Sequence, residues 1–318
     1  MIDSNLAIQT INLSKKFNKF IALDNLNIAV EPNTIYGFLG PNGSGKTTAI
    51  RLLAGLSHPT DGHSYVYGYE SFAKDMQVRR LIGYLPDVPS FFSFMSGLQY
   101  LTFCGQIFGL EYKVSQKQAY ELLEMTGIKE AAHRNAVKYS RGMKQRLGLA
   151  AALVGNPKVV FLDEPVSALD PIGRADILDI IKSLKEKTTV FLSTHILNDA
   201  ERVCDKVGII NNGTLLVSQS VDDLKKSYSK NGFEIRLKEE PIRALPVIHS
   251  QEWCEKIVSS FEVNGDYIMT VYVTNTIKAA KELQQILSTH EYALASFNAI
   301  RVSLEDAFIK LTGDKSDA

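Results

Sequence analysis

The sequence has few cysteines and no disulfide pattern. Its 318 residues include only Cys104, Cys204 and Cys254, which lie far apart and are odd in number. Such a set excludes a disulfide framework, and it has none of the close spacings of a cysteine metal site. The pattern therefore favours buried thiols in a reducing cytosol.

An excess of either charge and a long apolar run are also missing. The 35 Lys and Arg residues balance 35 Asp and Glu residues, so the formal net charge is zero. A general nucleic-acid binder or a protein held by anionic lipid needs surplus cations, so we expect no nucleic-acid partner. The longest apolar stretch, at 147–154, is far shorter than the roughly 20 residues of a membrane span. The N-terminus has no basic and apolar segments of a signal peptide, which predicts a cytoplasmic protein without its own transmembrane domain.

The first two thirds of the chain show the pattern of an α/β fold. Apolar and polar residues alternate over about the first 35 positions, which predicts an N-terminal antiparallel β subdomain. Nearly continuous apolar runs predict buried parallel strands at 35–39, 159–162, 190–192 and 207–210. Between them, helical spacing predicts helices at 97–108, 116–125 and 141–154, in a helical subdomain at about 88–155, and a further helix from Pro171. Strands that alternate with helices imply a mainly parallel sheet covered on both faces.

A second, smaller domain is expected at the C-terminal end. The composition changes after Lys226, and the polar segment 227–232 ends in Asn-Gly, which is typical of a linker. The pattern beyond it predicts strands at 233–237, 267–273 and 294–300, and helices at 252–259, 277–287 and 304–311. We therefore expect a first domain over residues 1–226 and a C-terminal α+β accessory domain over 233–318.

A phosphate-binding loop follows the strand at 35–39. Gly40-x-x-x-x-Gly45-Lys46-Thr47 matches the P-loop pattern, in which glycines let backbone N–H groups surround phosphate oxygens. The next helix directs its positive end at the same phosphates. Lys46 is expected to reach the β- and γ-phosphates, and Thr47 to ligate Mg²⁺. The candidate nucleotide-binding residues of this loop are Gly40, Pro41, Asn42, Gly43, Ser44, Gly45, Lys46, Thr47 and Thr48.

Two further buried strands end in polar residues. Asp163 and Glu164 follow the strand at 159–162, where Asp163 can hold Mg²⁺ and Glu164 can polarise the attacking water as a general base. The strand at 190–192 leads into Ser193-Thr194-His195, and His195 can hydrogen-bond the γ-phosphate. The predicted catalytic residues are therefore Glu164, His195 and Lys46.

These motifs together resemble the ATP-binding subunit of an ABC transporter, over about residues 5–225. GPNGSGKTT resembles the Walker A motif, VVFLDEP at 159–165 Walker B, SALD at 167–170 the D-loop and STH at 193–195 the switch histidine. YSRGM at 139–143 resembles the ABC signature, and Ser140 is a good N-cap for the helix that follows. The resemblance implies a P-loop NTPase core in which Phe17 stacks on adenine; the alternative is a core or edge-strand aromatic.

The resemblance also implies a head-to-tail homodimer or pseudo-symmetric dimer that encloses two ATP molecules. In it, one chain's signature and D-loop would face the nucleotide of the other chain. The residues concerned are Ser140, Arg141, Gly142, Met143 and Asp170. Arg141 replaces the usual Gly, and Met143 replaces a common Gln. Asp87 stands in place of the glutamine that contacts the metal, and an aspartate there could still bind a Mg²⁺-bound water.

The tail and one aromatic segment suggest a partner. VSLEDAFIKLTG at 302–313 resembles the end of the C-terminal extension in ATPases of ABC-2-type exporters. That likeness implies an ATP-hydrolysing subunit at the inner face of the cell membrane, bound to a separate permease. We expect Phe91, Phe92 and Phe94, in the segment 88–95, to dock a cytoplasmic helix of that permease. Two alternatives are a soluble ABC-type ATPase acting on the ribosome or nucleic acid, and a module that binds ATP without turnover.

Overall fold

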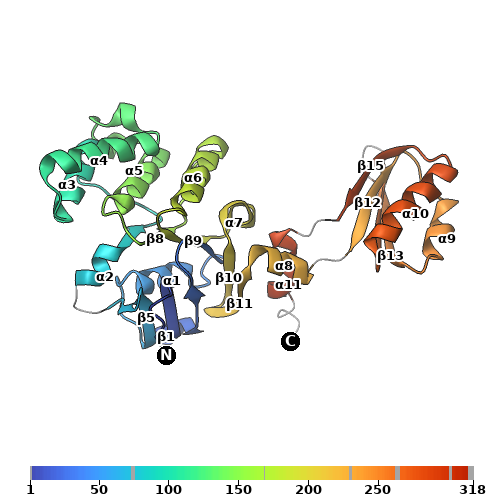
Figure 1. Cartoon of the computed structure of the whole chain (residues 1–318), viewed down its shortest axis with the longest axis horizontal. Coiled ribbons are helices and arrows are strands. Elements are labelled where there is room, and N and C mark those ends of the chain that lie inside the picture. Colours follow the sequence, from blue (N-terminus) through green and yellow to red (C-terminus); the bar gives the residue numbers. More distant parts are fainter. Residues whose placement is uncertain are drawn as a thin grey trace. The chain divides into compact units, whose positions relative to one another are not determined.

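The chain forms two compact units (Figure 1). The computed structural model describes residues 2–72, 76–167, 169–228, 231–261, 266–300 and 303–313. Unit 1 comprises Met1–Val221 and Phe308–Ala318, and unit 2 comprises Asp222–Ala307. This division differs from the expected bounds 1–226 and 233–318, because the chain from Phe308 onward groups with unit 1. Of the expected linker at 227–232, helix α8 (Val221–Tyr228) covers the first two residues and a strand begins at Gly232, while residues 229–230 lie outside the described residues.

The core of unit 1 is a six-stranded sheet in the order β11-β10-β4-β9-β8-β7. The five strands from β10 to β7 run parallel, and β11 pairs antiparallel with β10. Positive φ angles at Asn212 (46°) and Gly213 (78°) form the hairpin between β10 and β11, a turn for which an Asn-Gly pair is typical. The strands are β4 (Ile35–Leu39), β7 (Ile82–Leu85), β8 (Val159–Asp163), β9 (Thr189–Thr194), β10 (Lys206–Asn211) and β11 (Thr214–Ser220).

An antiparallel sheet precedes and flanks this core, as the alternating pattern predicted. Its strands are β1 (Ile8–Phe17), β2 (Phe20–Leu26), β3 (Ala29–Val30), β5 (Asp61–Val66) and β6 (Tyr69–Glu70). The order is β2-β1-β5-β6, with β3 paired to β1. Leu13 of this sheet shares one hydrophobic cluster with Phe38 and Phe161 of the core sheet and with Leu52 of α1 (Lys46–Leu53). The shared cluster fixes the P-loop between the two sheets.

The helical subdomain has its own hydrophobic core. Figure 1 shows α3 (Gly97–Ile107), α4 (Tyr112–Met125) and α5 (Arg141–Leu153) grouped together. Their buried residues form one cluster with short 3₁₀ turns, including Leu98, Leu101, Leu123, Leu147 and Val154. The remaining helices of this unit are α2 (Met76–Leu81), α6 (Pro171–Leu184) and α7 (Leu197–Val203). The expected helices and strands of the ATPase region are thus confirmed.

Unit 2 is a four-stranded antiparallel sheet in the order β13-β14-β12-β15, with helices. Its hydrophobic core contains Trp253, Met269 and Leu283, and the Trp253 indole donates a 2.6 Å hydrogen bond to Glu282. Its elements are β12 (Gly232–Leu237), α9 (Ala244–His249), β13 (Cys254–Phe261), β14 (Tyr267–Val273), α10 (Thr276–Thr289) and β15 (Leu294–Ala299), followed by α11 (Leu304–Gly313), which the division into units cuts.

One prediction for this unit was wrong, and one helix was not predicted. The segment expected as a helix at 252–259 is mostly strand β13, which pairs with β14 and contains the β-branched Ile257 and Val258. Helix α9 lies in a segment for which no element was predicted. Its Pro246 lies in the first turn, where the missing N–H removes no helical hydrogen bond.

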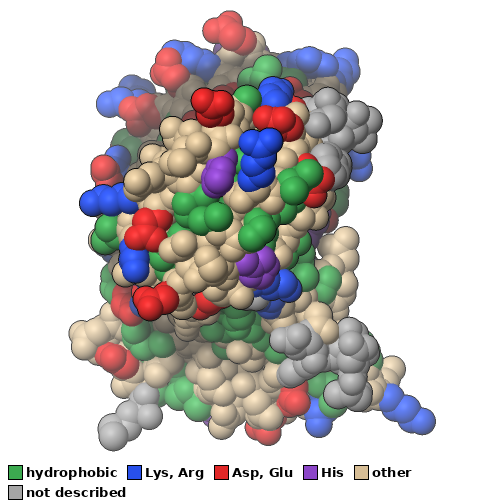
Figure 2. Space-filling view, turned by 90° about the vertical axis from the view of Figure 1, so that its right-hand side faces the viewer, with side chains coloured by type: hydrophobic (Ala, Val, Ile, Leu, Met, Phe, Trp, Pro, Cys, Tyr) green, Lys and Arg blue, Asp and Glu red, His purple; other side chains and the backbone are tan. Residues whose placement is uncertain are grey.

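No single charge dominates the face drawn in Figure 2, and the described helices are all too short or too polar to span a membrane. On the face drawn in Figure 2, acidic and basic side chains are interspersed with hydrophobic and polar ones. Within the described residues, no helix is both long and apolar enough to cross a membrane.

Candidate functional site

The P-loop connects β4 to α1 and is closely packed at Gly40 and Gly45. A Cβ at Gly40 would lie 2.3 Å from the carbonyl oxygen of Ile210, and Gly45 has a φ of 107°. Side chains at these positions would force the loop open. Ser44 Oγ is buried and finds no hydrogen-bond partner among the described residues. A buried hydroxyl without a partner in such a backbone cradle fits a bound phosphate group.

Lys46 holds the loop together in this structure. Its side chain is 6 % exposed, and its ammonium group donates hydrogen bonds to the carbonyl oxygens of Gly40 (2.8 Å) and Pro41 (3.1 Å). It also lies 3.5 Å from a carboxylate oxygen of Glu164. The ammonium is therefore positioned where it can exchange these neutral acceptors for phosphate oxygens, which form stronger, charge-assisted hydrogen bonds.

Asp163, at the end of β8, is a buried carboxylate held by two hydroxyl groups. Its Oδ1 accepts hydrogen bonds from Ser193 (2.6 Å) and Thr47 (3.1 Å), and the residue is 1 % exposed. Among the described residues no cation forms an ion pair with it. Burial raises the pKa of the Tyr84 hydroxyl, and the negative charge of Asp163 raises it further.

This arrangement fits Mg²⁺. The metal prefers oxygen ligands and is commonly held by one or two protein oxygens together with substrate phosphates. Asp163 and Thr47 supply such oxygens, and a bound cation would balance the negative charge of the Asp163 carboxylate. The described residues contain no group of three or more His, Cys, Asp or Glu residues that would form a protein-only metal cage.

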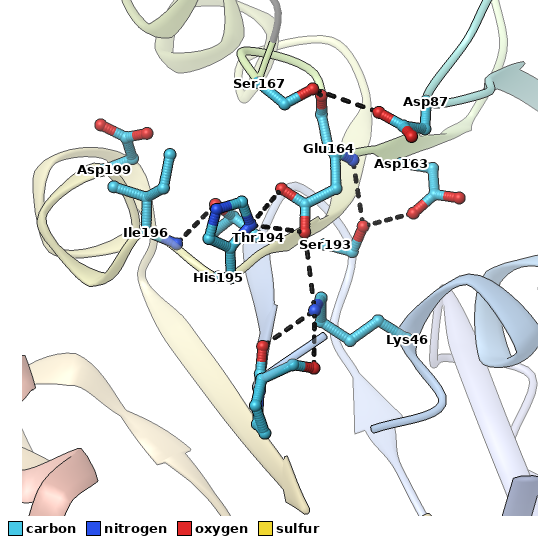
Figure 3. A network of polar contacts seen from close by, with 12 residues as sticks. Lys46, Asp87, Asp163, Glu164, Ser167, Ser193, Thr194, His195, Ile196 and Asp199 are labelled. Carbon is cyan, nitrogen blue, oxygen red and sulfur yellow. Dashed lines mark hydrogen bonds and ion pairs between the residues drawn. The ribbon is translucent and has the colours of Figure 1, made fainter. Parts of the chain in front are cut away.

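Glu164 is turned into the same space by an unusual backbone conformation. Its φ is 48°, in the left-handed region that non-glycine residues rarely adopt, and its N–H donates to Ser193 Oγ at 3.1 Å. His195 Nδ1 lies 3.1 and 3.0 Å from its two carboxylate oxygens. Figure 3 shows His195 and Lys46 directed at this carboxylate from different elements. The strained backbone and these contacts fix the carboxylate, as expected where orientation matters for chemistry.

A cavity of about 330 Å³ opens over the P-loop, lined by Asn42, Gly43, Gly45, Lys46, Thr47, Thr48, Asp87, Glu164, Ala22 and Phe20. Phe17, the predicted adenine-stacking residue, is not in this lining. It is 50 % exposed, with the Lys15 ammonium 5.0 Å from its ring centroid. Phe20, which pairs with Phe17 across the turn between β1 and β2, lines the cavity instead and was not among the predicted residues.

The signature segment lies at the start of α5. Ser140 is the N-cap, and its Oγ accepts a 3.2 Å hydrogen bond from the Met143 N–H. Asp170 caps α6 in the same way, through the Gly173 N–H at 3.2 Å. A Cβ at Gly142 would lie 2.9 Å from a Leu169 methyl group, so the two helix starts are closely packed.

A second cavity, of about 350 Å³, is lined by residues of α5 together with Glu164 and His195. Ser140 lines neither this cavity nor the one over the P-loop. The lining of the second cavity comprises Asn42, Asp87, Val88, Pro89, Arg141, Lys144, Gln145, Glu164, Ser167 and His195. Asp87 follows β7 and lines both cavities, and its Oδ1 accepts a 3.1 Å hydrogen bond from Ser167. The predicted roles of the signature in a second chain's site, and of Asp87 at the metal, stay predictions.

Two family models match the sequence. Residues 23–167 match the ABC transporter family, and residues 220–312 match the ATP-binding protein DrrA1-3-like C-terminal domain. An uncharacterized ABC transporter ATP-binding protein, YxlF of Bacillus subtilis, is 39 % identical over 94 % of this chain and 97 % of its own. The bacitracin transport ATP-binding protein BcrA of Bacillus licheniformis is 36 % identical over 96 % and 97 %. The daunorubicin/doxorubicin resistance ATP-binding protein DrrA of Streptomyces peucetius is 31 % identical over 98 % and 94 %.

Solved structures agree with this assignment. The ATP-binding subunit of an ABC transporter superposes with a TM-score of 0.64 at 26 % identity, over 70 % of this chain and 93 % of its own. A dimeric ATP-binding cassette in a post-hydrolysis state with ADP and Pi superposes with a TM-score of 0.63 at 25 % identity, over 67 % and 98 %. The predicted fold class, an α/β P-loop core with an antiparallel subdomain, a helical subdomain and a small C-terminal domain, is confirmed. The chain belongs to the ABC transporter family and is one of its ATP-binding, ATP-hydrolysing subunits.

Proposed function

We propose that the chain couples the hydrolysis of ATP, bound with Mg²⁺, to a separate ABC-2-type export permease at the inner face of the cell membrane. The observation that carries this proposal is the meeting of Lys46, Thr47, Asp163, Glu164 and His195 at one edge of the core sheet. The relatives named above as transport and resistance proteins support an exporter, and they favour it over the nucleic-acid alternative.

Each residue of this edge has a physical task in the reaction. The P-loop amides and Lys46 bind the β- and γ-phosphates, while Thr47 and Asp163 would hold Mg²⁺, which would supply positive charge to the phosphates. Glu164 accepts a hydrogen bond from the attacking water and takes its proton. His195 keeps the Glu164 carboxylate oriented through the hydrogen bond at 3.0–3.1 Å. Positioning and electrostatics supply most of the catalysis in phosphoryl transfer.

A second ATPase domain completes the site. The N-terminus of α5 is an anion-binding element, and its Ser140 and Gly142 line neither of the two cavities described above, although Arg141 lines the second. In a head-to-tail dimer it binds the γ-phosphate held by the other chain, and Asp170 lies at the same interface. The dimeric state of the solved cassette supports this arrangement.

The permease docks on the helical subdomain. A groove of about 420 Å³ is lined by residues of α3, α4 and the loop before α3, among them Phe94, Leu98, Phe103 and Tyr112. Phe94 is 72 % exposed and stacks with Phe92 at a centroid distance of 5.6 Å. Exposed aromatic residues around a groove are typical anchors for a partner helix.

The catalytic and dimer parts of the proposal are tested together. Glu164→Gln should slow ATP hydrolysis by about 10²–10⁴-fold, the usual contribution of a positioned base, and leave ATP binding intact. With hydrolysis blocked, ATP should convert the chain to a dimer in sedimentation, and adding Ser140→Arg should abolish that dimer. Parental hydrolysis in Glu164→Gln would remove Glu164 as the base, and an unchanged dimer in the double variant would contradict the sandwich.

The docking surface is tested separately. The chain should sediment with membranes when it is co-expressed with an ABC-2-type permease that it serves, and Phe94→Asp should reduce that fraction. The exposed Ile172→Asp change on α6, outside the groove, serves as the matched control. Equal membrane association of the two variants would contradict docking in this groove.

A further inference from the structure

A single hydroxyl group links Asp87 to the catalytic edge. Ser167 Oγ lies 3.1 Å from Asp87 Oδ1 and 3.1 Å from the carbonyl oxygen of Glu164. A serine hydroxyl has one hydrogen, so these two acceptors share one donor. Figure 3 shows Ser167 between the Glu164 backbone and the Asp87 carboxylate. This hydrogen bond thus links Asp87, which stands in place of the usual glutamine, to Ser167, which lies two positions after the Walker B motif.

The second oxygen of Asp87 is left for another partner. In Figure 3 it points away from Ser167, and no ion pair or hydrogen bond to it is formed by the described residues. Asp87 lines the P-loop cavity with Lys46, Thr47 and Glu164, so this carboxylate borders the predicted Mg²⁺ position. The other ionisable residues that line the neighbouring cavity with it are Arg141, Lys144, Glu164 and His195.

We propose that Ser167 is a positioning residue, whose hydrogen bond orients the Asp87 carboxylate so that its free oxygen faces the water shell of the nucleotide-bound metal. The inference rests on the Mg²⁺ site of the proposed function. Carboxylates near a metal are commonly held by outer-shell hydrogen bonds, and the loss of such a bond weakens metal affinity. An aspartate is shorter than a glutamine, and a fixed orientation compensates for its shorter reach.

A purely structural role would have a different signature. Ser167 is exposed, and a hydrogen bond in contact with water contributes little net stability because water replaces it. Removal of the hydroxyl should therefore change metal binding much more than unfolding. Ser167 also begins the segment that leads to Asp170, which we expect at the interface with the second chain, so dimer closure would act directly on the orientation of Asp87.

The test measures Mn²⁺ binding to the full chain saturated with ADP, by electron paramagnetic resonance. Ser167→Ala should weaken Mn²⁺ binding by about tenfold, the lower end of outer-shell effects, and Ser167→Thr should restore it. Asp87→Ala should weaken it at least as much, and the double variant should bind no worse than Asp87→Ala alone. Ser183→Ala is the matched control, because Ser183 is also an exposed hydroxyl that bonds only a local carbonyl oxygen, at 2.7 Å.

The outcomes separate this inference from the metal site itself. If Ser167→Ala keeps the wild-type Mn²⁺ affinity, the positioning role is overturned while the metal site stays in place. The same conclusion follows if Ser167→Ala weakens Mn²⁺ binding equally in the parent chain and in the Asp87→Ala chain. An ADP affinity of the wild-type chain that does not respond to Mn²⁺ would overturn both. Thermal unfolding of each variant shows that the chain is folded, and a loss of stability in Ser167→Ala as large as its loss of metal binding would also overturn the proposal.

Discussion

The hydroxyl of Ser193 is expected to stabilise the site more than any other single group at the sheet edge, and Ser193→Ala tests this. Ser193 is fully buried on β9, donates to the Asp163 carboxylate at 2.6 Å and accepts from the Glu164 N–H at 3.1 Å. Alanine removes both bonds at once. It leaves a buried carboxylate with the Thr47 hydroxyl as its remaining donor, and it leaves the strained Glu164 backbone without its partner.

The expected loss can be estimated from those two bonds. A hydrogen bond to a charged group contributes about 1.5–3 kcal/mol, and a buried N–H without a partner costs about 1–3 kcal/mol. Water that enters the vacated space recovers part of this, so we expect a net loss of about 2–4 kcal/mol in the free energy of unfolding. For a unit of this size, about 1 kcal/mol lowers Tm by about 2–4 °C, which gives a decrease of about 4–16 °C.

Urea unfolding followed by circular dichroism measures this loss, with Ser183→Ala as the control that should stay within about 0.5 kcal/mol of the parent. The steady-state ATPase rate should fall as well, because both Asp163 and Glu164 lose orientation. A Ser193→Ala chain within about 0.5 kcal/mol of the parent would refute the reasoning, since it would mean that neither bond contributes net stability.

Three further predictions concern other parts of the chain. If Phe17 stacks on adenine, Phe17→Ala should weaken ATP binding by about tenfold in equilibrium titrations, since stacking contributes about 1–3 kcal/mol. If Phe20→Ala weakens ATP binding more than Phe17→Ala does, Phe20, which lines the cavity, makes the adenine contact instead. Burial raises the pKa of the Cys204 thiol, so at pH 8 a maleimide should label Cys204 only after denaturation; rapid native labelling would contradict its burial. Glu282→Ala should lower unit 2 stability by about 1–3 kcal/mol in thermal unfolding, because it leaves the buried Trp253 N–H unpaired, and an unchanged transition would argue against that bond.

The core strands and the P-loop could be predicted because their signals are local. A strand buried on both faces must be apolar along its length, and β4, β8 and β9 are buried throughout. The polar residues that follow such strands must meet at one sheet edge, so the encounter of Lys46 with Glu164 followed from the order of the motifs. The C-terminal unit was harder, since β13 is a strand because β14 pairs with it, and that partner lies outside the local pattern.

Asp87 shows why the finer chemistry of the site could not be read from the sequence. From the sequence, the residue could be judged only by its charge and its short side chain, and both properties left its contact with Mg²⁺ undecided. What orients the carboxylate is a hydroxyl 80 positions away, on a segment whose own motif predicted an interface and no metal contact. Side-chain hydrogen bonds between loops depend on how β7 and β8 lie side by side and on where each loop leaves the sheet. A substitution at such a position should therefore be judged together with its hydrogen-bond partner, since the pair fixes the geometry that the longer glutamine would otherwise supply.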